Sequence, residues 1–328
     1  MRAIIYEEFG SANEVLKLVT AAKPVAGAGE VLVHLRTSGV NPSDTKARAG
    51  ARAIGQKPPF AQIIPHSDGA GVIVAVGEGV AQSRIGERVW LWNCGWNRAF
   101  GSAAEYIAIS QAHAVPLADN ASFVVGATLG IPALTACHCV LGSGPVKDKT
   151  LLISGGGGTV GHLAIQIAKT HGAEVITTVS KDEDANAATA IGADLVLRYN
   201  SPDLAEQIME FATDGIDHVI EVEFGSNVAT NAAVIKECGR IVAYGSAKNI
   251  TPQIPFYPLM FKAVTLDLVL VYLLSDKARA QAITHVNTML AKEQIAPRIA
   301  KTFPLSECAA AHMMVEGARK AGSVILQI

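Results

Sequence analysis

The segment LLISGGGGTVGHLAIQIAK, residues 151–169, decides the fold of this chain. It passes from an apolar β-type run, through four consecutive glycines, into a stretch with helical spacing of apolar residues. The pattern G-x-G-x-x-G falls at Gly156, Gly158 and Gly161, directly between the strand and the helix. There the three glycines permit a tight turn, a close approach of backbone to a pyrophosphate, and packing of helix on strand. The segment predicts a dinucleotide-binding loop, the alternative being a glycine-rich turn without a ligand.

Strands and helices alternate after this loop. Apolar runs predict six strands, at 150–154, 174–179, 194–197, 218–222, 240–244 and 265–271. Helical spacing predicts helices at 160–171, 182–191, 204–212 and 227–237. This order predicts an α/β fold with a doubly wound parallel sheet, whose strand C-termini and ligand lie along one edge.

The regions before and after the predicted parallel sheet show a different pattern of secondary structure. Up to about residue 121 the chain consists of short runs such as EVLVHLR and GAGVIVAVG, broken by Gly, Pro and Asn, which predict a mainly β domain. The tail predicts a helix at 278–291, an extended stretch at 295–303, a helix at 305–317 and a final strand, SVILQI. Because a lone strand needs a sheet to join, we expect it to return to the N-terminal domain. The predicted division is 1–122, then 123–264 for the nucleotide-binding domain, then 265–328 for its edge strand and the return.

Composition excludes several classes of protein. The chain has 328 residues, half of them hydrophobic and 17% charged, which predicts a compact globular protein of two domains. A net charge of −2 provides no basic surface for nucleic acid or anionic membranes. The apolar stretch 264–274 is too short for a membrane helix and predicts a buried strand. Five scattered cysteines and the absence of a signal peptide predict a cytoplasmic protein.

The end of the second strand of the predicted sheet selects between cofactors. An NAD enzyme usually places an acid there to bind the ribose 2′-OH, whereas this strand runs into Ser180 and Lys181. A hydroxyl and an ammonium suit a 2′-phosphate. The acids at 182–184 that follow are explained by the helix dipole. The sequence therefore predicts NADP(H).

The whole chain resembles the quinone oxidoreductase (zeta-crystallin) family of the medium-chain dehydrogenase/reductase superfamily. The resemblance rests on GVNPSDTKARAG (39–50), IPHSDGAGVIVAVGEGV (64–80), GIPALTACHCVL (130–141), the glycine loop and GRIVAYGS (239–246). It implies a Rossmann domain beside a discontinuous, mainly β, GroES-like catalytic domain.

The resemblance also implies a set of cofactor contacts. On the nicotinamide side they fall on Asn41 and Thr135. The contacts to the adenosine phosphate half fall on Gly158, Thr159, Val160, Ser180, Lys181 and Tyr199. The segments that close over the dinucleotide contain Tyr244, Gly245, Ser246, Leu270 and Val271, and Lys320 in the tail is implied to lie near a phosphate.

Alcohol dehydrogenases of the superfamily carry a catalytic zinc ion. The positions of this chain that correspond to their zinc ligands show whether zinc could bind here. They hold Asn41, Ser67 with Asp68, and Ile131, so none supplies a thiolate or an imidazole. Cys137, His138 and Cys139 are consecutive and point about 100° apart on a helix, so they cannot converge on one ion. His66, one place from a zinc position, is interpreted as a loop or pocket histidine. The sequence predicts no bound metal.

A site without zinc suits a hydride acceptor in which the negative charge formed during hydride transfer is delocalised. A quinone, or an enone attacked at its β-carbon, meets this condition better than alcohol oxidation does. Asn41 is the first candidate for a polar contact to the substrate, with Asp44 the second, although Asn41 equally suits a turn before Pro42. Trp92 and Trp96 are candidates for a pocket wall, and core packing is the alternative.

Two other functions stay open at this point. One is an enoyl-thioester reductase of the same superfamily, which uses a tyrosine soon after N-P-S-D, whereas no tyrosine occurs here between Tyr6 and Tyr106. The other is a catalytically weak NADPH-binding protein with a crystallin-like or regulatory role.

The apolar strand at 265–271 would form the edge of the parallel sheet, and an exposed apolar edge predicts a homodimer.

Overall fold

The structure, a computed structural model, describes residues 1–51, 56–317 and 321–328. The chain forms two compact units, one of Met1–Ile131 with Pro297–Ile328 and one of Pro132–Ala296. The sequence placed the corresponding divisions at residues 122 and 264. Lys320, a predicted phosphate neighbour, lies outside the described residues.

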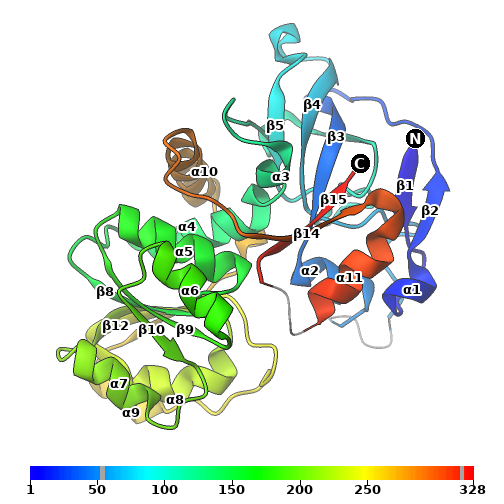
Figure 1. The fold of residues 1–328 in the computed structure, drawn as a ribbon. Coiled ribbons are helices and arrows are strands. Elements are labelled where there is room, and N and C mark those ends of the chain that lie inside the picture. Colours follow the sequence, from blue (N-terminus) through cyan, green and yellow to red (C-terminus); the bar gives the residue numbers. More distant parts are fainter. Residues whose placement is uncertain (52–55, 318–320) are drawn as a thin grey trace. The chain divides into compact units, whose positions relative to one another are not determined.

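The unit of residues 132–296 is built on a parallel sheet of six strands (Figure 1). Its strands are β8 (Thr150–Ser154), β9 (Glu174–Val179), β10 (Leu195–Arg198), β11 (Ile216–Glu221), β12 (Ile235–Ala243) and β13 (Thr265–Leu268). They lie in the order β10-β9-β8-β11-β12-β13, and every neighbouring pair is parallel. The predicted doubly wound sheet is therefore confirmed, with its strand order reversing between β8 and β11.

Helices cover both faces of this sheet, with α4, α5 and α6 on one side and α7, α8 and α9 on the other (Figure 1). The helices of the unit are α4 (Leu134–Leu141), α5 (Thr159–Thr170), α6 (Asp182–Ala190), α7 (Leu204–Phe211), α8 (Phe224–Val234), α9 (Phe256–Phe261) and α10 (Asp276–Ala291). The predicted helix at 227–237 ends early, because Ile235 already pairs with Ile216 in the sheet. The register then shifts before His218 meets Arg240.

The other unit contains a mixed sheet of seven strands and a separate two-stranded sheet, β1-β2. The order in the larger sheet is β14-β15-β3-β4-β5-β7, with β6 also paired to β3. The strands of the unit are β1 (Arg2–Ile5), β2 (Lys17–Thr20), β3 (Glu30–Val40), β4 (Asp68–Val76), β5 (Arg88–Leu91), β6 (Tyr106–Ser110), β7 (Ala114–Pro116), β14 (Ile299–Pro304) and β15 (Ser323–Gln327). Its α-helices are α1 (Ala12–Val15), α2 (Pro42–Arg48), α3 (Phe123–Gly126) and α11 (Cys308–Glu316).

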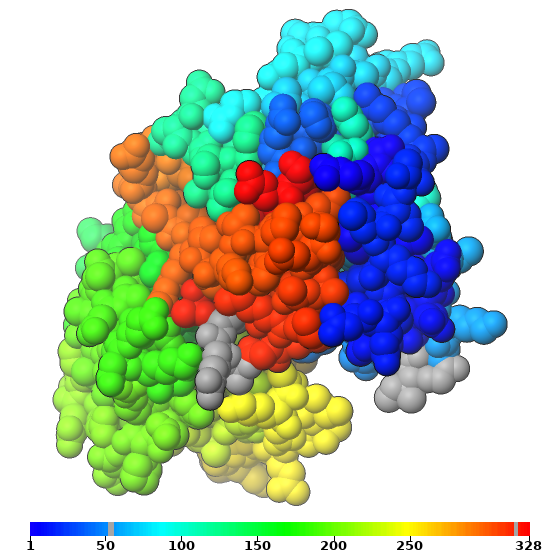
Figure 2. Space-filling view, turned by 45° about the vertical axis from the view of Figure 1, so that its right-hand side comes forward, coloured from blue at the N-terminus to red at the C-terminus, as the bar shows by residue number. Residues whose placement is uncertain are grey.

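The final strand completes the sheet that the N-terminal residues begin. In β15, Val324 lies opposite Val40 of β3, and the two strands run antiparallel. Helix α11 follows β14 and packs beside α1 and α2, and in Figure 2 the orange-red segment lies next to the blue N-terminal segment. The discontinuous, mainly β domain implied by the family resemblance is thus present.

The apolar stretch 264–274 is only partly a strand. Strand β13 ends at Leu268, and a single 3-10 turn, η4 (Val271–Leu273), follows. Because β13 is the last strand in the sheet order, Leu268 is 75% exposed, so the prediction of a buried strand is wrong here. Within the described residues, no helix combines the length and the apolar character needed to cross a membrane.

Candidate nucleotide-binding site

The glycine loop lies where β8 ends and α5 begins. A Cβ on Gly156 would stand 2.3 Å from Thr177 Oγ1, and one on Gly161 would stand 2.3 Å from the Gly155 carbonyl oxygen. Both positions exclude a side chain, and the second holds the helix tightly on the strand end. The turn itself is made one residue earlier than the sequence motif indicates, at Gly155, whose φ is +74°.

Gly158 differs from Gly156 and Gly161 because few protein atoms lie where its side chain would be. Among the described residues, a Cβ there would have only the Gly155 carbonyl oxygen, at 3.2 Å, within 4 Å. Gly158 is also the N-cap of α5, whose first N–H groups carry the positive end of the helix dipole. The loop therefore fits a pyrophosphate, which needs both close backbone approach and unpaired amide donors.

A buried carboxylate lies beside this loop at the point where the strand order reverses. Glu221, the last residue of β11, is completely buried, and its two oxygens accept four hydrogen bonds. Their donors are Ser154 Oγ (2.8 Å), Glu223 N (2.6 Å), Asn227 Nδ2 (2.9 Å) and Asn231 Nδ2 (2.9 Å). Glu221 therefore joins the end of β8 to the end of β11 and the start of α8. No motif in the sequence selects Glu221 as part of the site.

A second acid organises the loop after β12. Glu223 accepts hydrogen bonds from the backbone N–H groups of Ala247 (3.0 Å), Lys248 (2.8 Å) and Asn249 (3.4 Å). The predicted segment Tyr244–Ser246 precedes this loop, and the Ser246 hydroxyl accepts from Gly225 N at 2.9 Å. The segment is thereby fixed at the carboxyl ends of β11 and β12, next to the glycine loop.

The predicted adenosine-side residues follow the next two strands. Ser180 and Lys181 are exposed directly after β9, with Lys181 as the N-cap of α6. Tyr199 follows β10, and its backbone N–H donates to Val179 O at 3.2 Å, which brings the ends of the two strands together.

Two further cations lie there that sequence reasoning did not select. The Lys248 ammonium is 5.1 Å from the centre of the Tyr199 ring, and Arg198 forms an ion pair with Asp182, the residue after Lys181. The carboxyl ends of β9 and β10 therefore carry Lys181 and Arg198, the latter paired with Asp182, and Lys248 from the loop after β12 reaches them through Tyr199. Such cations can bind a phosphate.

The remaining predicted contacts lie on other elements. Leu270 and Val271 follow β13, and of the two Val271 is buried and Leu270 exposed. The Val269 backbone N–H donates to Ala243 O at 2.8 Å. Thr135 is buried in the first turn of α4. The structure thus places Leu270, Val271 and the Tyr244–Ser246 segment at the same edge of the sheet as the glycine loop, whereas Asn41 belongs to the other compact unit.

In that unit Asn41, Asp44 and Asp68 form a buried polar group at the start of α2. The Asp44 carboxylate accepts from the Asn41 backbone N–H at 2.8 Å, and Asn41 Nδ2 donates to Asp68 Oδ2 at 2.7 Å. Burial holds the pKa of Asp68 well above its ordinary value, while the hydrogen bond from Asn41 opposes the shift. Asn41 and Asp44 therefore shape the entry to the helix, and one Asn41 amide hydrogen is used by Asp68.

The two tryptophan candidates lie in different environments. Trp92 is buried, its ring stacks on His113 with centroids 3.8 Å apart, and its Nε1 donates to Ala112 O at 3.2 Å. These contacts are those of a core side chain. Trp96 is partly exposed, so a role in a pocket wall stays a prediction for Trp96.

The structure also tests whether zinc suits the positions that bind it in alcohol dehydrogenases. Asn41 presents an amide committed to Asp68, Ser67 a buried hydroxyl, and Ile131 a buried hydrocarbon. Catalytic zinc requires three protein ligands drawn from imidazole, thiolate and carboxylate. The donors at these three positions do not fit zinc.

A parallel sheet with a glycine loop at its switch point, joined in one chain to a discontinuous β unit, defines a dinucleotide-dependent oxidoreductase of the medium-chain dehydrogenase type. Two family models match, described as "Alcohol dehydrogenase GroES-like domain" (residues 27–119) and "Zinc-binding dehydrogenase" (residues 159–287). A quinone oxidoreductase of Mus musculus is 30% identical over 332 residues, which cover 99% of this chain and 97% of the mouse protein. The chain belongs to the quinone oxidoreductase family of the medium-chain dehydrogenase/reductase superfamily, as its sequence motifs predict.

Solved structures agree with this fold. A mycobacterial protein solved as a complex with NADPH has a TM-score of 0.88 and 26% identity, and the match covers all of both chains. A protein described as an NAD-dependent alcohol dehydrogenase has a TM-score of 0.90 and 25% identity, again over both complete chains. The predicted α/β fold class and the GroES-like domain are confirmed.

Proposed function

We propose that this protein transfers a hydride from NADPH to a quinone or an α,β-unsaturated carbonyl compound, without a catalytic zinc ion. The observation that carries the proposal is the carboxyl edge of the parallel sheet, where the glycine loop, Glu221 and three cations lie together. The names of the related quinone oxidoreductases and the NADPH complex of a structural neighbour support it.

NADPH, rather than NADH, is the cofactor that these cations favour. The 2′-phosphate adds close to two negative charges at the adenosine ribose, and Lys181, Arg198 and Lys248 supply hydrogen-bond donors for it. No carboxylate ends β9, whereas an enzyme that selects NAD uses one to bind the 2′-OH. The acid nearest to Lys181 in sequence, Asp182, is already paired with Arg198.

When bound, the reduced nicotinamide supplies the hydride. The chain holds the dinucleotide through the backbone of the glycine loop and through loops that Glu221 and Glu223 fix in place. Asn41, whose side-chain amide donates to Asp68, stays our candidate for a polar contact to the substrate. Solvent supplies the proton to the hydroquinone or enolate, because the delocalised charge needs no strong acid at the moment of transfer.

The test is an assay of NADPH consumption with quinones, enones, enoyl thioesters and simple alcohols or aldehydes, repeated with NADH and with chelator-treated enzyme. We expect turnover of quinones or enones, a preference for NADPH, and no effect of the chelator. Selective turnover of enoyl thioesters would move the protein to the thioester reductases. Tight binding of NADPH without any turnover would indicate a crystallin-like or regulatory role.

We further propose a homodimer formed at the edge of the parallel sheet. Strand β13 is the last strand in the sheet order, and large apolar side chains around it are exposed. They are Phe256, Tyr257, Met260, Phe261, Leu268 and Leu273. A free strand edge surrounded by apolar surface is covered when a second copy pairs with it.

Light scattering tests the dimer. We expect twice the mass of the chain at micromolar concentration, and a monomer for Leu268→Lys, which places a charge on the edge. Glu293→Lys also introduces a lysine, on the turn after α10 where it reverses the charge, and serves as the control. A wild-type monomer would disprove the proposed interface.

We also propose a cytoplasmic location, which five free cysteines support.

A further inference from the structure

Three side chains capable of binding a metal meet in the interior of the unit of residues 1–131 and 297–328. They are His66, just before β4, and Cys308 and His312, which lie four residues apart on one face of α11. Their ligand atoms all lie within 4.8 Å of one another. The exposed fractions are 2% for His66, 1% for Cys308 and 0% for His312, so the cluster is sealed from solvent.

The two imidazoles point at each other through the same ring nitrogen. His66 Nε2 lies 2.8 Å from His312 Nε2 and 4.0 Å from Cys308 Sγ. Ligands of one zinc or copper ion, at metal distances near 2.0–2.3 Å, stand about 3.4–3.8 Å apart. To reach that spacing the two rings must separate by roughly half an ångström, and the thiol, which lies within 4.8 Å of both imidazole nitrogens, must move closer to them.

Hydrogen bonds on the far side of His66 fix its tautomer. The Ser38 hydroxyl has one proton, which it donates to the Asp68 carbonyl oxygen, 3.3 Å away, or to Ser102 Oγ, 2.8 Å away. Ser38 Oγ must then accept from His66 Nδ1, which is 2.9 Å away. His66 therefore carries its proton on Nδ1 and directs the Nε2 lone pair into the cluster. A metal-binding histidine is held in this way, with its other nitrogen bonded to a neighbouring oxygen.

The histidine pair alone leaves a polar atom unsatisfied. With His66 Nε2 as acceptor, His312 Nε2 donates the shared proton, and His312 Nδ1 finds no hydrogen-bond partner among the described residues. Burial, together with the nearby Arg48 guanidinium, lowers the pKa of His312 to about 3, and burial raises the pKa of the Cys308 thiol. His66 also has a φ of +80°, a strained backbone state that concentrates at functional sites.

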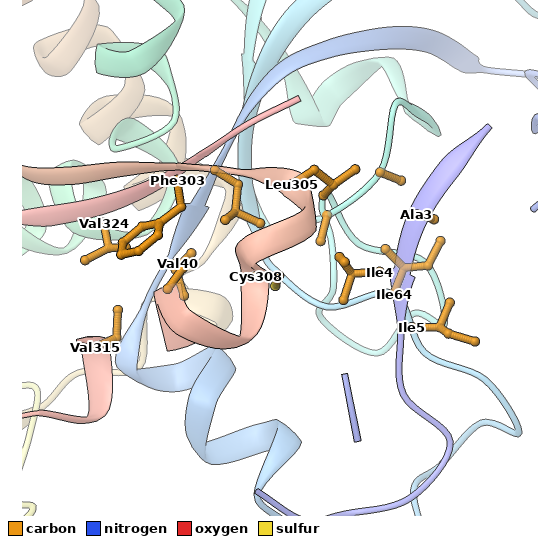
Figure 3. Close-up of a cluster of buried hydrophobic side chains, with 14 residues drawn as sticks. Ala3, Ile4, Ile5, Val40, Ile64, Phe303, Leu305, Cys308, Val315 and Val324 are labelled. Atoms are coloured by element: carbon orange, nitrogen blue, oxygen red, sulfur yellow. The ribbon is translucent and has the colours of Figure 1, made fainter. Parts of the chain in front are cut away.

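The surroundings of the cluster favour a soft ion of low charge. Figure 3 shows Cys308 on α11 among apolar side chains that include Val40 of β3, Ile4 of β1 and Ile64 from the stretch before β4. One thiolate and two neutral imidazoles suit the thiophilic d10 cations, and three ligands leave the ion three-coordinate or open at a fourth position. Hard cations such as Mg²⁺ and Ca²⁺ require oxygen ligands, and this set offers none.

We propose that His66, Cys308 and His312 bind one thiophilic d10 cation, Cu(I) or Zn(II), through both Nε2 atoms and the Cys308 thiolate. The ion replaces the proton between the two rings, which moves to His312 Nδ1, and displaces the thiol proton, so one proton is released per ion. The site uses none of the positions that bind zinc in alcohol dehydrogenases, nor Cys137, His138 and Cys139. Because it is sealed, loading requires folding around the ion or local opening of α11.

Metal binding by the full-length protein tests the proposal. Metal-free protein is titrated with buffered Zn(II) and, under anaerobic reducing conditions, with Cu(I), after brief warming to open the fold. We expect one equivalent of one or both ions and a rise in Tm of about 5 °C at a hundredfold excess over Kd. Comparison of the two affinities identifies the ion. Failure of both ions to bind at micromolar concentration would overturn the proposal.

Substitutions locate the ion. Cys308→Ser and His66→Asn should weaken binding by roughly 100-fold or more, Asn being chosen because it tolerates a positive φ. Cys94→Ser removes a buried thiol from a different core cluster of the same unit and should leave binding unchanged. Equal binding by Cys308→Ser and the wild type would contradict the assignment. Co(II) provides a readout that needs no variant, since loaded wild-type protein lacking thiolate-to-cobalt charge-transfer absorption would also contradict it.

Discussion

Two buried carboxyl groups, one in each compact unit, are held in opposite ways. Glu221 accepts four hydrogen bonds, three of them from residues within ten positions along the chain. Asp68 is as deeply buried, yet it accepts one side-chain hydrogen bond, from Asn41, with a smaller contribution from the Ile131 backbone, and burial keeps its pKa high. A carboxylate surrounded by donors makes a rigid support for a ligand site, whereas one with few donors stays sensitive to pH.

The largest expected effect on NADPH binding comes from the glycine loop, in the same compact unit as Glu221. In Gly161→Ala the new Cβ meets the Gly155 carbonyl oxygen at 2.3 Å, so helix and strand must separate. We expect a loss of about 1–3 kcal/mol in the free energy of unfolding and no measurable binding of NADPH. Denaturant unfolding and fluorescence titration measure the two quantities.

Gly158→Ala is the matched control for this loop. Its Cβ would meet a single protein atom, at 3.2 Å, so stability should change by less than about 1 kcal/mol while the affinity for NADPH still falls. Wild-type stability and wild-type affinity in Gly161→Ala would show that the close packing of this loop is not required.

The next effect concerns the carboxylate itself. Glu221→Gln places an NH2 group against two of the four donors, and we expect a loss of roughly 2–4 kcal/mol with weaker NADPH binding. Glu223→Gln keeps an oxygen for the N–H groups of Lys248 and Asn249 and should cost about 1 kcal/mol. Urea midpoints compare the two variants, and equal losses would mean that the four donors do not distinguish Glu221.

A smaller effect sharpens the assignment of cofactor. Lys181→Ala should raise the KM for NADPH about tenfold, the consequence of losing one charge-assisted contact, and leave the KM for NADH unchanged. Arg198→Ala should act in the same direction. Lys292→Ala, a surface lysine at the end of α10, should alter neither constant. A proportional rise for both cofactors would contradict a 2′-phosphate site at this edge.

The smallest effect tests the pH-sensitive carboxyl. Because the folded pKa of Asp68 is raised, the folded state retains its proton longer than the unfolded chain, and stability falls as pH rises above the ordinary value of 3.8. Asp68→Asn removes this loss while keeping an oxygen for Asn41, so it should match the wild type near pH 3.5 and exceed it by about 1–2 kcal/mol at neutral pH. Urea unfolding across that range measures the difference. A difference independent of pH would exclude the titration of Asp68 as its cause.

The two regions also differ in how far their sequence predicts them. The glycine loop, Ser180 and Lys181 belong to one strand–helix–strand segment, so their spacing along the chain already determines their chemistry. Glu221 was missed because a single acid at a strand end resembles any surface acid until its partner Ser154, 67 residues away, is known.

Residues that are far apart in the sequence and meet only in the folded chain leave no periodic pattern from which their contact could be predicted. His66 and His312 stand 246 residues apart, and only the return of the tail to the first sheet brings them together. The exposure of Leu268 likewise depends on which strand ends the sheet, a property of the complete topology rather than of the apolar run.

The pairing of β15 with β3 has a consequence for how the protein is made. On the ribosome, residues 132–296 form a continuous unit that can fold as soon as they emerge, whereas residues 1–131 must wait for 297–328 to complete their sheet. During that interval the edge of β3 that later receives β15 is unpaired in the nascent chain, which exposes it to chaperones and to wrong pairing. The earliest residues to be synthesised are thus among the last to be secured.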